Sequence, residues 1–126
     1  MNGLESNGSD ASVVGHDMAS AVASCLEAGK VLAHSHRDYC GVGLQLQDGK
    51  YVCAEVFEGN VATEGEYQRN TANGDAMEFC GFQSRDEFVD WLAQQTDNSL
   101  SGKHLPNDWL HDNQRLTVAR LREFIA

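Results

Sequence analysis

Two histidines and a thiol lie within seven residues of one another, at His34, His36 and Cys40. Imidazole and thiolate are preferred zinc ligands, and a cysteine beside a histidine can act as a nucleophile with a general base. However, the spacing matches no structural zinc pattern, and a fourth ligand would have to come from Cys53 or Cys80. His-x-His on a strand also places both rings on one face, often a solvated one. We therefore expect no metal site here.

Motifs of the common enzyme classes are not found in the sequence. It has no G-x-S-x-G elbow, no Walker loop, no dinucleotide-binding glycine motif between a strand and a helix, and no H-E-x-x-H. The four cysteines include no C-x-x-C and lie in apolar stretches, which favours reduced buried thiols over a disulfide framework. We expect a non-catalytic protein without a cofactor.

Acidic residues dominate the charge of the chain. There are 19 acidic and 9 basic residues, with a formal net charge of −10. This disfavours nucleic acid as a partner, because phosphate binding needs a basic face, and it favours a basic partner. One local acidic cluster comprises Glu55, Glu58, Glu64 and Glu66. It is either an interaction surface or a solvated loop that keeps the protein soluble.

A β-hairpin over residues 40–57 is the clearest structural signal. Apolar and small or polar residues alternate up to the pair Asp48-Gly49, which suits a two-residue turn. The resulting register pairs Leu46 with Tyr51, Leu44 with Cys53, Val42 with Glu55 and Cys40 with Phe57. One face is then apolar except for Glu55. That carboxylate must sit at an open edge, pair with a base, or have an elevated pKa.

Residues 76–100 form the expected centre of the core. Alternation over residues 76–82 predicts a strand, and Ser84-x-x-Glu87 predicts a capping box that starts a helix. Helical spacing then gives this helix an inward face formed by Phe88, Trp91 and Leu92.

Further helices are expected at both ends of the chain. One runs from about Ser12 to Gly29, with an inward face of Val14, Met18, Ala21, Val22 and Cys25. A one-turn helix begins near Asn107. The last is capped by Thr117 and stapled by Leu116 and Leu121, with Arg115, Arg120 and Arg122 pointing outward. Residues 58–75 read as a long connection, with at most a short strand near Tyr67.

These elements predict one α+β domain over residues 12–126: an N-terminal helix, an antiparallel sheet of about four strands, and C-terminal helices packed on the sheet. Residues 1–11 are polar and are expected to be a mobile tail. No apolar run is long enough to span a bilayer and no signal peptide is apparent, so we expect a cytoplasmic protein without a membrane partner.

Residues 82–102, FQSRDEFVDWLAQQTDNSLSG, followed by Trp109 and residues 113–121, resemble small bacterial proteins associated with immunity to toxins. The resemblance covers about the last third of the chain. It implies a cytoplasmic protein that binds and blocks a cognate toxin. It would assign partner binding to the acidic cluster of residues 55–66, with Asp86 and Asp90 as a second patch.

Two alternatives stay open. The first is a chaperone of the type III secretion kind, a small acidic α+β protein that is usually a homodimer and wraps an unfolded effector segment around apolar grooves. The second is a small thiol- or zinc-dependent enzyme that uses His34, His36 and Cys40. Dimer formation and exposed apolar area would distinguish the chaperone from the immunity protein.

Overall fold

The computed structural model describes residues 13–33, 42–57, 60–74, 79–100 and 116–126. In chain order the elements are α1 (His16–Glu27), β2 (Val42–Gln47), β3 (Lys50–Phe57), β4 (Asn60–Val61), α2 (Glu64–Ala72), β5 (Phe79–Phe82), α3 (Arg85–Ala93), α4 (Asp97–Leu100) and α5 (Val118–Ile125). The predicted α+β architecture is confirmed. The tail of residues 1–11 and the one-turn helix near Asn107 lie outside the described residues.

Within the described ranges the sheet has four antiparallel strands, and β3 pairs with the other three. β2 and β3 form the predicted hairpin. Its turn residues both have positive φ, 50° at Asp48 and 84° at Gly49, as a tight two-residue turn requires. The predicted register is confirmed, with the pairs Leu46–Tyr51, Leu44–Cys53 and Val42–Glu55. The predicted pair of Cys40 with Phe57 includes a residue outside the described ranges.

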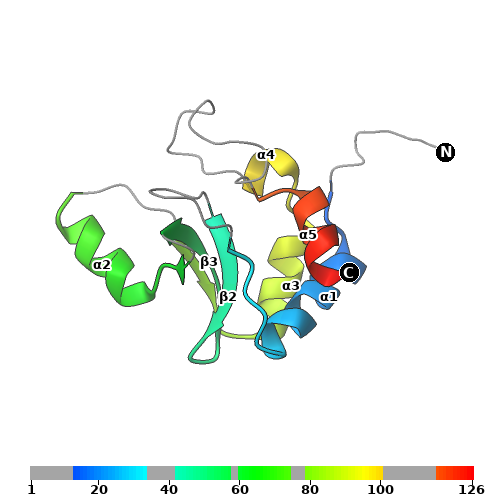
Figure 1. Cartoon of the computed structure of the whole chain (residues 1–126), viewed down its shortest axis with the longest axis horizontal. Coiled ribbons are helices and arrows are strands. Elements are labelled where there is room, and N and C mark those ends of the chain that lie inside the picture. Colours follow the sequence, from blue (N-terminus) through cyan, green and yellow to red (C-terminus); the bar gives the residue numbers. More distant parts are fainter. Residues whose placement is uncertain (1–12, 34–41, 58–59, 75–78, 101–115) are drawn as a thin grey trace.

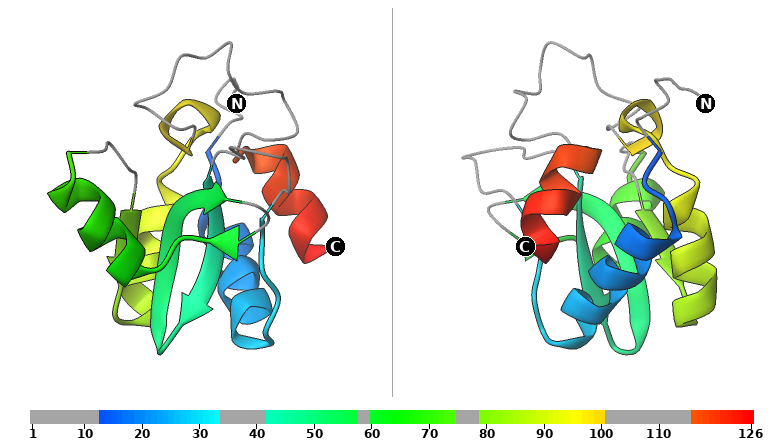
Figure 2. Two further views of the ribbon diagram at one scale, coloured as in Figure 1. Left: turned by 60° about the vertical axis from the view of Figure 1, so that its left-hand side comes forward. Right: turned by 90° about the vertical axis from the view of Figure 1, so that its right-hand side faces the viewer.

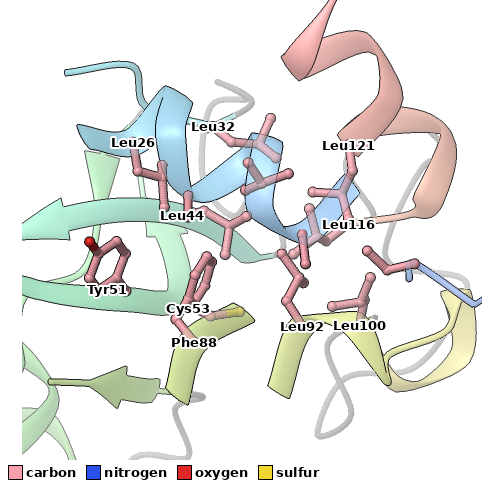
Figure 3. Packing of buried hydrophobic residues seen from close by; sticks show 14 of the residues in the cluster. Leu26, Leu32, Leu44, Tyr51, Cys53, Phe88, Leu92, Leu100, Leu116 and Leu121 are labelled. Carbon is pink, nitrogen blue, oxygen red and sulfur yellow. The ribbon is translucent and has the colours of Figure 1, made fainter. Parts of the chain in front are cut away.

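Helices cover the two faces of the sheet unequally. α1, α3 and α5 lie together on one face, whereas α2 stands on the other side, away from them (Figures 1 and 2). The main core fills the space between the sheet and the three helices (Figure 3). Its largest fully buried side chains are Val22, Leu26, Val42, Leu44, Phe88, Leu92, Leu116 and Leu121.

Two of the predicted helix starts are confirmed at atomic detail. The Ser84 hydroxyl accepts a hydrogen bond from the backbone N–H of Glu87 at 3.1 Å, and Thr117 accepts one from Arg120 at 3.2 Å. These bonds satisfy amides that the first turn of a helix leaves without a partner. The capping box predicted at Ser84 forms only in the half in which Ser84 accepts from Glu87, because the Glu87 carboxylate accepts from the Ser84 hydroxyl at 3.3 Å in place of the Ser84 backbone N–H. Asp97 adds a further bond at the start of α5, because its Oδ1 accepts from the N–H of Val118 at 2.8 Å.

A helix in the predicted long connection was missed. α2 follows Thr63, whose hydroxyl accepts from the N–H of Glu66 at 3.2 Å while the Glu66 carboxylate accepts from the N–H of Thr63 at 2.9 Å. The expected short strand near Tyr67 is therefore wrong, since Tyr67 lies within this helix. The sequence signal was a second capping box, Thr63-x-x-Glu66, in a segment too polar to show helical periodicity.

Two predicted orientations are also corrected. α1 begins at His16 and not near Ser12, and its buried residues are Ala19, Val22, Ala23 and Leu26. Of the predicted inward face, Val14 and Val22 are buried and Met18 packs against the core, whereas Ala21 and Cys25 are only half-buried. Arg120 does not point outward, because its side chain is half-buried beside the core, whereas Arg122 is exposed. Burial lowers the pKa of the Arg120 guanidinium.

Candidate functional site

The six carboxylates predicted to bind a partner do not form one surface. Two lie on α2 and two lie on α3, and these helices are on opposite sides of the sheet (Figure 1). Of the other two, Glu55 is inside the protein and Glu58 lies outside the described residues. Proximity in the sequence did not predict proximity on the surface, because Glu55 is buried on β3 whereas Glu64 and Glu66 lie on α2, on the other side of the sheet.

Glu55 belongs to the interior. It is the one charged side chain that is buried among the described residues, with 2% of its surface exposed. It lies two and four positions after Cys53 and Tyr51 along β3, so it shares their face of the strand and points toward the helix layer. Its assignment to an exposed acidic cluster is therefore wrong, and so is a position at an open edge.

Glu64 and Glu66 are exposed, but both make contacts within the protein. The Glu64 carboxylate forms an ion pair with the Lys50 ammonium at 2.6 Å, and Glu66 completes the capping box with Thr63. The ion pair joins the start of α2 to the hairpin. A partner would have to compete with these contacts to use either carboxylate.

An open groove of about 500 Å³ lies between α2 and the outer face of the hairpin. Its lining includes Gln47, whose amide donates to the Ala62 carbonyl at 3.1 Å and to the Gln45 side chain at 3.0 Å. Phe79 also lines it, and its ring stacks on Tyr67 of α2 with centroids 5.1 Å apart. Most of the lining side chains are polar or charged: Gln45, Gln47, Asp48, Lys50, Thr63 and Glu64.

The second predicted patch is on the exposed face of α3. Asp86 and Asp90 are both exposed and are separated by one helical turn, so they share a face. Asp90 accepts a hydrogen bond from His16 of α1 at 3.1 Å, and the contact becomes an ion pair when that imidazole is protonated. Buried Phe88 and Leu92 fix the opposite side of α3 against the core.

Polar contacts along the seam between α1 and α3 hold this acidic face in place. Arg85, at the start of α3, donates to Glu27 at 2.7 Å and to the hydroxyls of Ser20 at 2.9 Å and Ser24 at 3.1 Å. With the contact of His16 at the other end, the seam is bridged along most of its length. The two helices therefore present a single rigid surface.

Tyr51 extends this network from the helices into the sheet. It is 8% exposed, and its hydroxyl donates to Glu27 at 2.5 Å while its ring stacks on Phe88. The hydrogen bond from Tyr51, followed by that from Arg85, lowers the pKa of the Glu27 carboxyl. The same bond raises the pKa of the Tyr51 hydroxyl, because the bond to a carboxylate favours the protonated phenol.

Tyr51→Phe is expected to reduce stability by about 1 kcal/mol at neutral pH and to weaken the dependence of stability on acid. The pKa of Glu27 is lower in the folded protein than its ordinary value of 4.5. Its contribution is therefore complete above the unfolded pKa and is lost as the pH falls through the folded pKa. Urea unfolding between neutral and acidic pH measures this loss, which should be smaller in the variant.

Tyr67→Phe is the matched control, since it removes a hydroxyl from α2, on the other side of the sheet from Glu27. It should reproduce the acid dependence of the unchanged protein. If Tyr51→Phe and the unchanged protein lost stability in parallel on acidification, Tyr51 would not control the Glu27 carboxyl.

The predicted cluster of His34, His36 and Cys40 lies outside the described residues. Within the described ranges, no three or more His, Cys, Asp or Glu side chains form a group that could hold a metal ion. The cysteines at positions 25, 53 and 80 are thiols, as predicted, but only Cys53 of these three is buried, whereas Cys25 is half-buried and Cys80 is exposed. None of the helices in the described part of the chain combines the length and apolar character needed to cross a bilayer.

Comparison of the chain with models of protein families, with curated proteins and with solved structures finds no match.

Proposed function

We propose that this protein is a non-catalytic binding protein of the immunity type, which neutralises a basic protein toxin through the acidic face of α3. The observation that supports this proposal is the exposed pair Asp86 and Asp90, one turn apart on a helix whose other side is buried. The net charge of −10 supports it independently. Charge complementarity steers a basic partner toward such a face and raises the association rate.

The rigidity of the face matters as much as its charge. A surface that is already ordered loses little conformational entropy when a partner binds. The contacts of Arg85 with α1 and the burial of Phe88 provide this order without using Asp86. The face offers fixed carboxylates to a partner and no nucleophile beside a base. A blocking role therefore suits it better than catalysis.

The proposal includes the setting in which the protein acts. We place it in the cytoplasm of a bacterium, where it would meet a toxin whose active cleft is basic. It would need no cofactor, and nucleic acid and membrane would not be partners. Whether it acts as a monomer or as a homodimer does not change the proposed face.

The chaperone alternative has less support from the surface. Such a chaperone binds unfolded segments through apolar grooves, but the groove beside α2 is lined largely by polar side chains. Among the described residues, the large hydrophobic side chains that are exposed are Val13 and Val31. A light-scattering mass equal to two chains, together with recovery of secretion effectors, would favour the chaperone nevertheless.

The first experiment is capture of tagged protein from its native host, with mass spectrometry of the eluate. Immunity predicts one stoichiometric protein, encoded beside this gene, that is toxic when expressed alone and harmless together with this chain. An eluate that contained effectors bound to a dimer would contradict the proposal.

The double variant Asp86→Lys, Asp90→Lys should then weaken binding of that partner by roughly 10- to 100-fold, mainly through slower association, with little change in melting temperature. Glu58→Lys with Glu64→Lys is the matched comparison, because it makes the same change in net charge and reverses the other predicted patch. Surface plasmon resonance at two salt concentrations measures both. Loss of affinity in the second variant alone would move the interface to α2.

A further inference from the structure

Cys53 and Cys80 face each other across two strands of the sheet. Cys53 is on β3, Cys80 is on β5, and the antiparallel register makes them direct Cα partners. Directly opposed residues of an antiparallel pair project from the same face of the sheet. Cys25, by contrast, is on α1. The fold thus brings together two cysteines that are 27 positions apart in the sequence.

One of these thiols is accessible from solvent. Cys80 is exposed, whereas Cys53 is 9% exposed. A cavity of about 100 Å³ lies against both, and the helix layer closes it with Trp91, Gln95, Ser99 and Leu100. A reagent can therefore reach Cys80 more readily than Cys53.

The separation of the pair suits a reversible bond. Directly opposed Cβ atoms are about 4.5–5.5 Å apart, and a disulfide needs about 3.5–4.5 Å. The strands must therefore approach slightly, and the bond stores strain that makes it easy to reduce. We propose that Cys53 and Cys80 form a labile cross-strand disulfide, so that this pair is a modification site for low-molecular-weight disulfides of the glutathione class.

The reaction proceeds by two thiol–disulfide exchanges. The Cys80 thiolate attacks one sulfur of oxidised glutathione, forms a mixed disulfide and releases one glutathione thiolate. The Cys53 thiolate then attacks the sulfur of Cys80 and releases the second glutathione thiolate. The two cysteines are oxidised, one glutathione disulfide is reduced to two thiols, and the protons lost by Cys53 and Cys80 are taken up by these thiols.

The bond would fix β5, which packs on both faces of the sheet. Its Phe82 packs against the main core, where the ring centroids of Phe82 and Trp91 are 4.9 Å apart. Its Phe79 packs against the smaller apolar cluster on the face toward α2. The segment that a 53–80 disulfide closes contains β4 and α2. Oxidation should therefore stabilise the folded protein, because the bond closes this segment and restricts the unfolded chain.

The test uses the full chain in buffers that contain reduced and oxidised glutathione at graded ratios. Remaining thiols are alkylated, and intact mass and peptide mapping identify the products. The expected product has lost two hydrogen atoms, links the peptides of Cys53 and Cys80, and returns to the thiol form when reduced glutathione is restored. Its melting temperature should exceed that of the reduced protein.

Cys80→Ser, a change at an exposed position, should abolish the product, and Cys25→Ser and Cys40→Ser should leave it intact. Circular dichroism of Cys80→Ser verifies that the variant folds. Three outcomes would each overturn the proposal: a stable mixed disulfide at Cys80 that Cys53 never displaces, a bond from Cys80 to Cys40, or a pair that stays reduced in fully oxidised glutathione.

Discussion

Replacing Gly43 by alanine is expected to destabilise the protein by about 3 kcal/mol, because the new methyl group has no space. A Cβ atom built at Gly43 would lie 2.2 Å from the backbone oxygen of Leu32 and 2.8 Å from a methyl carbon of Val56. That oxygen cannot move aside freely, since it accepts a hydrogen bond from the N–H of Leu44 at 2.8 Å. Urea unfolding measures the loss, and the melting temperature should fall by roughly 10 °C.

Gly65→Ala is the matched control for this substitution. A Cβ atom there would meet nothing nearer than the Arg69 guanidinium at 3.5 Å, and the residue lies in the exposed first turn of α2. Alanine favours a helix over glycine by up to about 1 kcal/mol, so this variant should keep or slightly gain stability. Equal midpoints for both variants would mean that residues near Leu32 do not lie against β2 as described.

The hairpin shows what the sequence alone can establish about this fold. Its register follows from a period of two and from the pair Asp48-Gly49, which adopts the positive φ angles that the turn needs. Both signals are local, so the hairpin and its register can be predicted without knowledge of the rest of the chain. The same holds for the helix starts at Ser84 and Thr117, where a side chain bonds an amide three residues away.

The candidate sites depend on contacts that no local pattern encodes. The strand order determines that Cys80 lies opposite Cys53, and pairing between distant strands could not be predicted from either sequence segment. The alternation along β3 did place Glu55 on the apolar face, yet grouping it with Glu64 by position overlooked that the two are on different faces of the sheet. The proximity of Asp86 and Asp90 on α3 could be predicted from the sequence, because helical spacing alone makes these two residues neighbours.

Phe88→Ala is expected to cost about 3–5 kcal/mol, the largest effect of any substitution considered. Phe88 is fully buried and is the centre of an aromatic group, with its ring centroid 5.2 Å from Tyr51, 5.9 Å from Phe82 and 6.2 Å from Trp91. Its removal leaves a cavity where α3 meets β3 and β5, and the surrounding rings can fill it only in part. Chemical unfolding measures the loss, and tryptophan fluorescence should shift because Trp91 loses a neighbour.

Phe79→Ala separates this packing effect from the simple loss of a phenyl ring. Phe79 lies on the same sheet but on its outer face, where it is half-buried and contacts Tyr67 of the exposed helix α2. Since less apolar surface returns to water there, the expected loss is about 1–2 kcal/mol. Unequal losses would confirm that the helix-covered face carries most of the stability, which in turn keeps Asp86 and Asp90 fixed for a partner. Equal losses would show that α2 packs as firmly as α3, and the rigid surface of the protein would then have to be sought on both sides of the sheet.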